Sequence, residues 1–440
     1  MKVMKFGGTS IGSPERMKLV ADIVVNYADT PSLIVLSALS GTTTALHKFS
    51  YALANNERNR AKQGIDKLEN FYIDFVSELI DNEENKKQVI IEIGEQFNFL
   101  RVMMKISYSN AMQKDIVAQG ELLSTKLFSA YLQNKGIHHA LLPALDFMQI
   151  DSDGEPLIGN IKVKLTQLIQ AEKSTQLFIT QGSVCRNHRG EMDNLKRGGS
   201  DYSASLISAA INATVCEIWT DIKGMQNIDP GISDKTIPLE NLSFEEAAEL
   251  TYFSAKILHP TSIWPAFQYN IPVRLQNILD PSAQGTTISK MASGVEKVKA
   301  IAARDNIIAI SIKSSRMLQA HGFLKKIFNV FDHFTTPIDM VNTSEISVTL
   351  TIDNKENLQK IVGELETFGE VKVEENLTIV LMVGSQILQS PQLIRTVFSS
   401  LGDIPIRMVS YGGGENNISL LINTDQKVKV LQALNKGIFG

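Results

Sequence analysis

The sequence predicts an α/β protein, with a mainly parallel sheet in its N-terminal part and two smaller modules at its end. Up to about residue 290, short β-branched runs alternate with longer helical patterns, which is typical of a parallel sheet covered by helices. After Gly294, the order strand, helix, strand, strand, helix occurs twice. A chain of 440 residues is also too long for a single hydrophobic core.

Within the N-terminal part, four β-branched runs predict strands: Leu33–Ser37, Gln176–Thr180, Thr214–Thr220 and Ile271–Leu275. Ser13 and Pro14 predict a helix start, because serine caps the first N–H groups and proline suits the first helical turn. Ser243 to Glu246 fits a capping box before another helix. Residues 58–107 are polar and rich in helix formers, which predicts a helical insertion beside the sheet.

The C-terminal part predicts two ferredoxin-like modules. The first contains strands at 307–312, 338–342, 347–352 and 371–374 and helices at 320–334 and 355–367. The second contains strands at 378–384, 406–410 and 417–422 and helices at 391–401 and 426–436. The second module lacks a final strand, and the stretch 298–303 is expected to complete it. We therefore expect domains at 1–294, 304–375 and 376–440.

Composition excludes several classes of function. The net charge is -4 and no basic stripe occurs, which argues against nucleic-acid binding. The apolar runs are shorter than the roughly 18–20 residues that span a bilayer. Two cysteines are too few for a disulfide framework, and the N-terminus shows no signal peptide, so we expect a cytoplasmic protein.

The segment Lys5-Phe6-Gly7-Gly8-Thr9-Ser10 follows a predicted strand. Ligands bind at this end of the strands in open α/β sheets. Gly7 and Gly8 allow backbone N–H groups to approach phosphate oxygens, and Lys5 can neutralise their charge. No G-x-x-x-x-G-K-[ST] sequence occurs, so this is not a Walker A loop.

The same segment resembles the opening signature of the aspartate kinases, and further segments occur in that family's order. They are Ser37-Ala38 with Gly41 to Thr43, Gly120 to Ser124, Arg197-Gly198-Gly199-Ser200-Asp201, Trp219 to Asp221, and Lys256 to Pro260. The resemblance implies the amino-acid kinase fold followed by paired ACT domains. It also implies ATP-dependent phosphorylation of the aspartate side chain to 4-phospho-L-aspartate, the first step of lysine, threonine and methionine biosynthesis.

The resemblance also implies the roles of individual residues. Lys5 and Asp201 are expected to be catalytic. Aspartate is expected to contact Thr43, Glu121, Arg197, Gly198, Gly199 and Ser200. ATP, carrying Mg²⁺ without a dedicated protein metal site, is expected to contact Lys5, Phe6, Gly7, Gly8, Thr220, Asp221, Gln226, Gly231, Lys256 and Ile257.

Two positions depart from the family. An aromatic residue is common where Gln226 stands, and an arginine is common where Gly231 stands. Lys223 or Lys235 is a candidate for the replacement charge. The departures keep one alternative open, a catalytically weak amino-acid sensor. A second alternative is an amino-acid kinase with another carboxylate substrate.

The first C-terminal module also resembles the effector-binding segments of lysine-sensitive aspartate kinases. Met317, Asp339, Ser344 and Glu345 are the expected effector residues, and the acidic pair suits the two ammonium groups of lysine. Diaminopimelate and threonine remain alternative effectors. Because open sheets with free edges are stabilised by pairing, we expect a homodimer or larger homo-oligomer through these modules.

Overall fold

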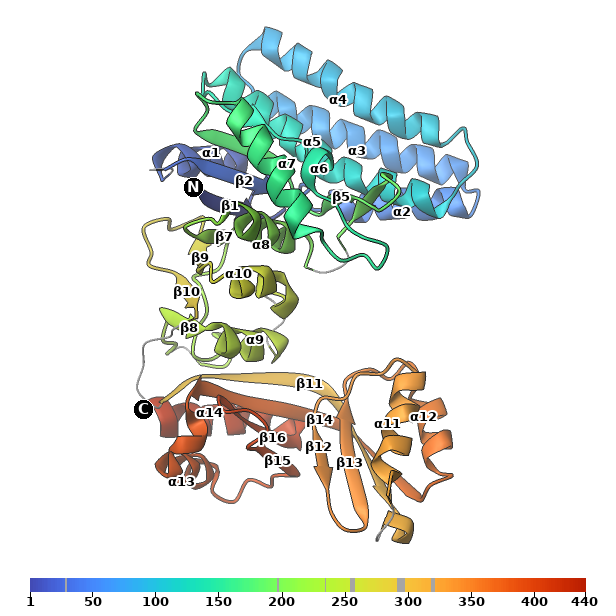
Figure 1. The fold of residues 1–440 in the computed structure, drawn as a ribbon, viewed down its shortest axis with the longest axis vertical. Coiled ribbons are helices and arrows are strands. Elements are labelled where there is room, and N and C mark those ends of the chain that lie inside the picture. Colours follow the sequence, from blue (N-terminus) through green and yellow to red (C-terminus); the bar gives the residue numbers. More distant parts are fainter. Residues whose placement is uncertain (28–29, 196–197, 234, 254–257, 291–296, 318–320) are drawn as a thin grey trace. The chain divides into compact units, whose positions relative to one another are not determined.

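A computed structural model describes residues 1–27, 30–195, 198–233, 235–253, 258–290, 297–317 and 321–440. The chain forms two compact units (Figure 1). The first unit comprises residues 1–225, 240–244 and 258–292, and the second comprises residues 226–239, 245–257 and 293–440. Two short segments that precede residue 294 therefore belong with the C-terminal part. The predicted boundary at 294 itself lies outside the described residues.

In the described residues, the first unit contains an eight-stranded sheet in the order β3-β4-β2-β1-β7-β9-β10-β8. Neighbouring strands are parallel except for β10, which is antiparallel to β9. The strands are β1 (Lys2–Phe6), β2 (Ser32–Leu36), β3 (Ala140–Leu141), β4 (Leu177–Gln181), β7 (Cys216–Thr220), β8 (Asn241–Ser243), β9 (Val273–Asn277) and β10 (Thr286–Ser289). The four strands predicted from β-branched runs are confirmed as β2, β4, β7 and β9. A separate pair, β5 (Val184–Arg186) and β6 (Met192–Asn194), forms a small hairpin.

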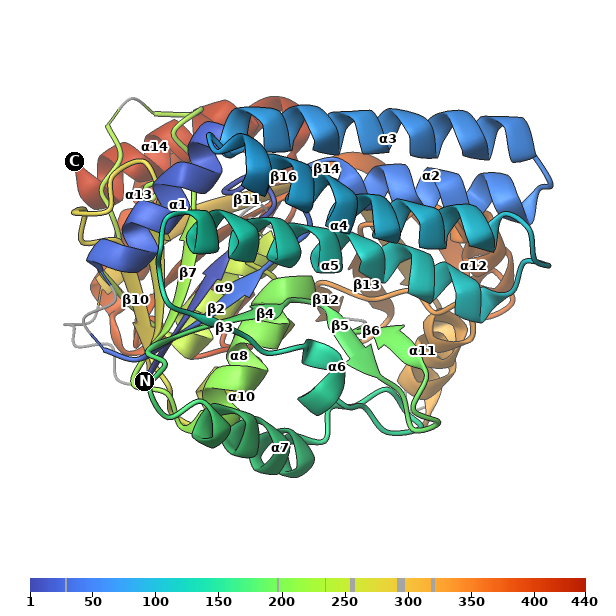
Figure 2. The ribbon, with the colours of Figure 1, turned by 90° about the horizontal axis from the view of Figure 1, so that it is seen from above.

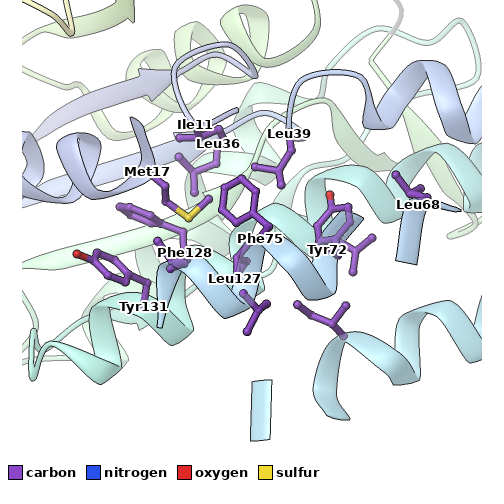
Figure 3. Close-up of a cluster of buried hydrophobic side chains, with 14 of the residues drawn as sticks. Ile11, Met17, Leu36, Leu39, Leu68, Tyr72, Phe75, Leu127, Phe128 and Tyr131 are labelled. Carbon is purple, nitrogen blue, oxygen red and sulfur yellow. The ribbon is translucent and has the colours of Figure 1, made fainter. Parts of the chain in front are cut away.

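Long helices cover one face of this sheet (Figure 2). They are α1 (Pro14–Asn26), α2 (Thr42–Ala54), α3 (Arg58–Leu79), α4 (Glu83–Met103) and α5 (Asn110–Asn134). Figure 3 shows part of their shared core, in which Met17, Phe75 and Phe128 meet Leu36 of β2. The predicted helical insertion is thereby confirmed as α3 and α4. The other helices of the unit are α6 (Ala144–Phe147), α7 (Ile158–Ala171), α8 (Gly199–Ile211) and α10 (Trp264–Gln268), with a 3₁₀ turn at Pro260–Ile263.

The predicted start of α1 is also confirmed. Ser13 adopts an extended conformation, its hydroxyl accepts a hydrogen bond from the backbone N–H of Arg16, and Pro14 occupies the first helical position.

In its described residues, the second unit contains a six-stranded antiparallel sheet in the order β12-β13-β11-β14-β16-β15. The strands are β11 (Lys297–Lys313), β12 (Val341–Thr343), β13 (Ser347–Ile352), β14 (Glu370–Ser385), β15 (Met408–Tyr411) and β16 (Asn417–Asn423). Helices α11 (Phe323–His333) and α12 (Leu358–Leu365) pack on one end of the sheet, and α13 (Pro391–Leu401) and α14 (Lys427–Phe439) pack on the other. Short 3₁₀ turns occur at Ser315–Met317, Ile387–Gln389 and Thr424–Gln426.

The two central strands differ from the prediction. The sequence predicts separate strands at 298–303 and 307–312 and at 371–374 and 378–384, whereas each pair forms one continuous strand. The register between β11 and β14 shifts at Arg304 to Ile307, and Asn306 (φ 62°) and Asn376 (φ 60°) adopt left-handed conformations. Asparagine tolerates this conformation, so each strand bends without leaving the ladder. The modules therefore share their two longest strands, and the boundaries at 304 and 376 stay predictions.

The opposite face of this sheet carries a separate apolar cluster. Ile307 and Ala309 point away from the face of Ile308 and Ile310, because side chains alternate along a strand. Phe253, the last residue of α9 (Phe244–Phe253), packs against this cluster. The predicted helix after the capping box is confirmed as α9, and all of it except Phe244 belongs to the second unit. Among the described helices, none is long and apolar enough to span a membrane.

Candidate active site

The glycine loop begins at the end of β1, which lies between β2 and β7. A Cβ atom at Gly8 would lie 2.6 Å from the carbonyl oxygen of Ala38, so only glycine allows the two loops to approach. A Cβ atom at Gly7 would lie 3.4 Å from Nζ of Lys5. Because Gly7 has no side chain, space remains beside the ammonium group of Lys5, as a phosphate site requires.

Lys5 and Asp201 form an ion pair between these elements. Nζ of Lys5 lies 2.5 Å from Oδ1 of Asp201, and the two side chains are only 12% and 19% exposed. Lys5 comes from β1, whereas Asp201 lies in the first turn of α8. The pair fixes the ammonium group at the end of the sheet's central strands.

The loop after β2 connects this pair to α5 and α8. The hydroxyl of Ser37 donates a hydrogen bond of 2.9 Å to Oγ of Ser200, and Oγ of Ser124 donates one of 2.7 Å to the carbonyl oxygen of Ser37. A Cβ atom at Gly120 would lie 2.8 Å from Cβ of Ala38. Segments that are far apart in the sequence therefore meet around residues 37–43.

Glu121 is a buried carboxylate in α5. The residue is 6% exposed, and its Oε2 atom has no hydrogen-bond partner among the described residues. Burial raises the pKa of Glu121 to about 7, although backbone hydrogen bonds at Glu121 and Ala38 lower it. A cation that enters this site would pair with Oε2 of Glu121 and would favour the charged form of its carboxylate.

Thr43 lies in the first turn of α2, after Gly41, which adopts a left-handed conformation (φ 84°). The hydroxyl of the neighbouring Thr42 lies 3.1 Å from the hydroxyl of Tyr72, which anchors this turn on α3. Thr43 itself is half-buried. The N–H groups of this first helical turn are suited to an anionic ligand.

The start of α8 is a second such turn. Gly198 (φ 63°) and Gly199 (φ 52°) adopt conformations that favour glycine, and Ser200 is 7% exposed. A side chain at Gly182 would clash with Ser200, so the chain after β4 packs directly on this turn. Arg197, the expected partner of the substrate carboxylate, lies outside the described residues.

Thr220 is the last residue of β7, the strand next to β1, and Asp221 follows it directly. Oδ2 of Asp221 lies 3.5 Å from Nη1 of Arg16, which also donates a hydrogen bond of 2.8 Å to the carbonyl oxygen of Thr9. The hydroxyl of Ser10 donates to the carbonyl oxygen of Trp219 at 3.2 Å. The predicted Thr220-Asp221 segment is therefore tied to the glycine loop. Phe6, predicted with this group, is buried and stacks on Trp219, which is a core role.

The remaining predicted nucleotide residues lie elsewhere in the chain. Gln226 and Gly231 belong to a loop of the second unit. Lys256 and Ile257 lie outside the described residues. No group of three histidine, cysteine, aspartate or glutamate side chains suited to a metal ion occurs in the part of the chain that the structure describes.

The expected effector residues lie in the second unit. Ser344 and Glu345 are exposed in the turn between β12 and β13, where Oγ of Ser344 lies 2.7 Å from Oγ of Ser347. Met317 packs partly buried against the core of the first module. The side chain of Asp339 is only 2% exposed, and its Oδ1 atom accepts a hydrogen bond of 2.6 Å from the hydroxyl of Tyr252. The carboxylate predicted to be available for an effector is therefore largely enclosed.

Three residues around these sites were not predicted as site residues. Ser37 lies in one of the segments that resemble the family but was given no role, and neither Arg16 nor Tyr252 was singled out from the sequence. Each acquires its role from a partner at least seven residues away in the sequence. Of the three, Ser37 had a signal in the sequence, because it ends the predicted strand Leu33–Ser37 and ligands bind at this end of the strands.

Comparisons with known proteins identify the family of the chain. The model of the amino acid kinase family matches residues 1–277, and a model of the ACT domain matches residues 380–437. The lysine-sensitive aspartokinase 3 of Escherichia coli (strain K12) is 30% identical over 448 residues, which cover 99% of each chain. The structure of E. coli aspartokinase III with lysine and aspartate matches the whole chain with a TM-score of 0.85, and the structure with aspartate and ADP does so with 0.80, both at 30% identity.

Proposed function

The chain belongs to the aspartokinases of the amino acid kinase family, which phosphorylate aspartate with ATP, and we propose that Lys5 and Asp201 form the centre of this reaction. The observation that carries the proposal is the ion pair of Lys5 and Asp201 beside the side-chain-free Gly7. An ammonium group held at this position neutralises charge on a phosphoryl group during transfer.

The chemistry requires no protein base. The side-chain carboxylate of aspartate has a reference pKa of about 3.9, so the nucleophile is ionised at neutral pH. Its oxygen attacks the γ-phosphorus of ATP, the bond from that phosphorus to the bridging oxygen breaks, and ADP leaves. The product is an acyl phosphate. Catalysis therefore depends on positioning and on charge neutralisation.

We propose that the buried carboxylate of Glu121 binds the α-ammonium group of aspartate. Its Oε2 atom lacks a partner, and burial disfavours its charge until a cation enters. The first turn of α8 at Gly198, Gly199 and Ser200 offers N–H groups to a carboxylate of the substrate, and Thr43 offers a hydroxyl. Arg197 stays a predicted partner of the same carboxylate.

For ATP, we propose phosphate binding at Gly7 and Gly8 and further contacts at Thr220 and Asp221. The space beside Lys5 fits a phosphate, and Asp221 offers a carboxylate near the glycine loop. Mg²⁺ is typically bound by one or two carboxylates together with substrate phosphates, and it would neutralise phosphate charge when bound. Gln226, Gly231, Lys256 and Ile257 remain proposed nucleotide contacts.

We further propose that lysine inhibits the enzyme through Met317, Asp339, Ser344 and Glu345. The relative from E. coli is named lysine-sensitive, and its structure was solved with lysine. Asp339 has a buried oxygen, Oδ2, without a partner among the described residues, which suits an ammonium group. A homo-oligomer formed through the ACT modules is part of the same proposal.

The test is a coupled ADP-release assay over a panel of amino acids, with hydroxylamine trapping of the acyl phosphate. We expect release that depends on L-aspartate and yields the aspartyl hydroxamate. A hydroxamate formed from glutamate or N-acetylglutamate but not from aspartate would overturn the substrate assignment. The absence of turnover with all of them would favour a sensor instead.

A further inference from the structure

The loop that contains Gln226 and Gly231 closes on itself through Asn227. The backbone N–H of Asn227 donates to the carbonyl oxygen of Ile237 at 2.9 Å, and Oδ1 of Asn227 accepts from the N–H of Ile237 at 2.7 Å. Gln226 forms a β-bridge with Pro238. Asn227 is only 1% exposed, so these bonds are shielded from water. These contacts hold the two ends of the 226–239 loop together.

The same loop is anchored on the second ACT module by apolar contacts. Ile228 is 2% exposed and belongs to the core cluster that contains Ile301 of β11 and Leu431 and Leu434 of α14. The N–H of Ile301 donates a hydrogen bond of 2.7 Å to the carbonyl oxygen of Asn227. Ile232 packs against the same cluster. The loop is therefore part of this module's core, although it lies far away in the sequence.

One residue of α14 connects two points of the loop. Oδ1 of Asn435 accepts a hydrogen bond of 3.3 Å from Nδ2 of Asn227, and Nδ2 of Asn435 donates one of 3.3 Å to Oγ of Ser233. Gly231 lies between these two contact points, and Gln226 directly precedes the first. A single amide side chain thus spans the part of the loop in which the sequence departs from its family.

We infer that Asn435 is a positioning residue that holds the 226–239 loop in the conformation that binds ATP. Because Gly231 provides no cation and Gln226 provides no aromatic ring, the affinity of the loop for ATP depends on its fixed backbone. The second ACT module therefore has a direct part in nucleotide affinity. This inference rests on the proposed function, in which the loop contacts ATP.

The decisive variant is Asn435→Leu, which has a similar volume but loses both hydrogen bonds. We expect KM for ATP to rise about three- to tenfold, the effect of losing a partly buried hydrogen bond, while kcat and KM for aspartate stay unchanged. Asn435→Asp should restore KM for ATP in part, since its carboxylate still accepts from Nδ2 of Asn227, whereas the hydroxyl of Ser233 donates to the carbonyl oxygen of Lys235. Ser233→Ala should raise KM for ATP less, and the double variant with Asn435→Leu should add nothing further.

Gln432→Ala is the matched control, because Gln432 is exposed on the same helix one turn earlier. An unchanged KM for ATP in Asn435→Leu, with normal aspartate phosphorylation by the wild type, overturns the inference and leaves the proposed function intact. A parallel rise in KM for aspartate, or an equal effect of Gln432→Ala, also overturns the inference, since either result indicates a change that is not specific to the 226–239 loop. A wild type without aspartate-dependent ADP release contradicts the proposed function instead, and calorimetric titration with Mg²⁺-ATP then tests Asn435 separately.

Discussion

The hydroxyl of Tyr252 donates a hydrogen bond of 2.6 Å to Oδ1 of Asp339, although the two residues are 87 positions apart in the chain. Arg304 stabilises the pair, because its guanidinium lies 4.8 Å from the ring centroid of Tyr252 and 3.5 Å from Oδ1 of Asp339. Burial raises the pKa of Asp339, whereas the bond from Tyr252 lowers it. The last turn of α9 is thereby connected to the proposed effector carboxylate.

We predict that Asp339→Ala abolishes inhibition by lysine at concentrations that inhibit the wild type, because an ammonium group loses its buried partner. The measurement is a lysine titration of aspartate-dependent ADP release. Glu375→Ala is a control, since this carboxylate pairs with Lys355 on the surface. A wild type that lysine does not inhibit, or an Asp339→Ala enzyme inhibited equally, contradicts the effector site.

A separate prediction concerns Tyr252→Phe, which keeps the ring beside Arg304 but removes the hydroxyl. The carboxylate of Asp339 then loses the bond that orients it, and half-inhibition should require about three- to tenfold more lysine. The activity without lysine is measured in the same titration as a reference. Lysine inhibition of unchanged strength in Tyr252→Phe would show that the bond has no part in effector binding.

For the catalytic pair, Lys5→Ala should lower kcat at least about a hundredfold with little change in KM for aspartate, because a preorganised charge that acts in the transition state is lost. Steady-state kinetics with both substrates provide the measurement. Lys18→Ala is the control, since this half-buried lysine of α1 donates a hydrogen bond of 3.0 Å to the carbonyl oxygen of Glu78 on α3. A Lys5→Ala enzyme that keeps most of its kcat contradicts the assignment.

The pH dependence of aspartate binding follows from Glu121. Burial raises the pKa of this carboxyl group to about 7, so it is protonated in the free enzyme below that pH and charged above it. Only the charged form pairs with the α-ammonium group, so KM for aspartate should rise about tenfold per pH unit below 7 and level off above it. In Glu121→Gln, KM for aspartate should be high and independent of pH in this range. A wild-type KM that is constant from pH 6 to about 8 contradicts this role.

Self-association is expected through the ACT modules. Leu324 and Phe328 lie one turn apart on α11 and are 41% and 40% exposed, and all three residues of β12 are exposed. We predict that the full-length chain sediments as a dimer or larger species at micromolar concentration, and that Leu324→Asp with Phe328→Asp shifts it towards monomer. Tyr51→Asp, at an exposed aromatic residue of α2, is the control. A monomeric wild type contradicts the proposal.

Much of the fold was predictable, because local patterns carry it. The strands at 33–37 and 176–180 were recognisable from β-branched runs, and Ser13 with Pro14 marked the start of α1. That the predicted strands at 298–303 and 307–312 form one strand could not be predicted, because asparagine, which stands at 306, is equally typical of a turn. Whether such a residue ends a strand or bends it depends on the partner strand, which a local pattern does not contain.

By itself, the sequence predicted the residues of the proposed reaction centre, since Lys5, Gly7, Gly8 and Asp201 lie in segments that resemble the family and occur in its order. Only the tertiary structure decided which side chains hold that chemistry in place. Asn435 contacts Asn227, 208 positions away, and Tyr252 contacts Asp339, 87 positions away. The physical reason is that a hydrogen bond or an apolar contact depends on distance in space. Periodicity and spacing report only distance along the chain.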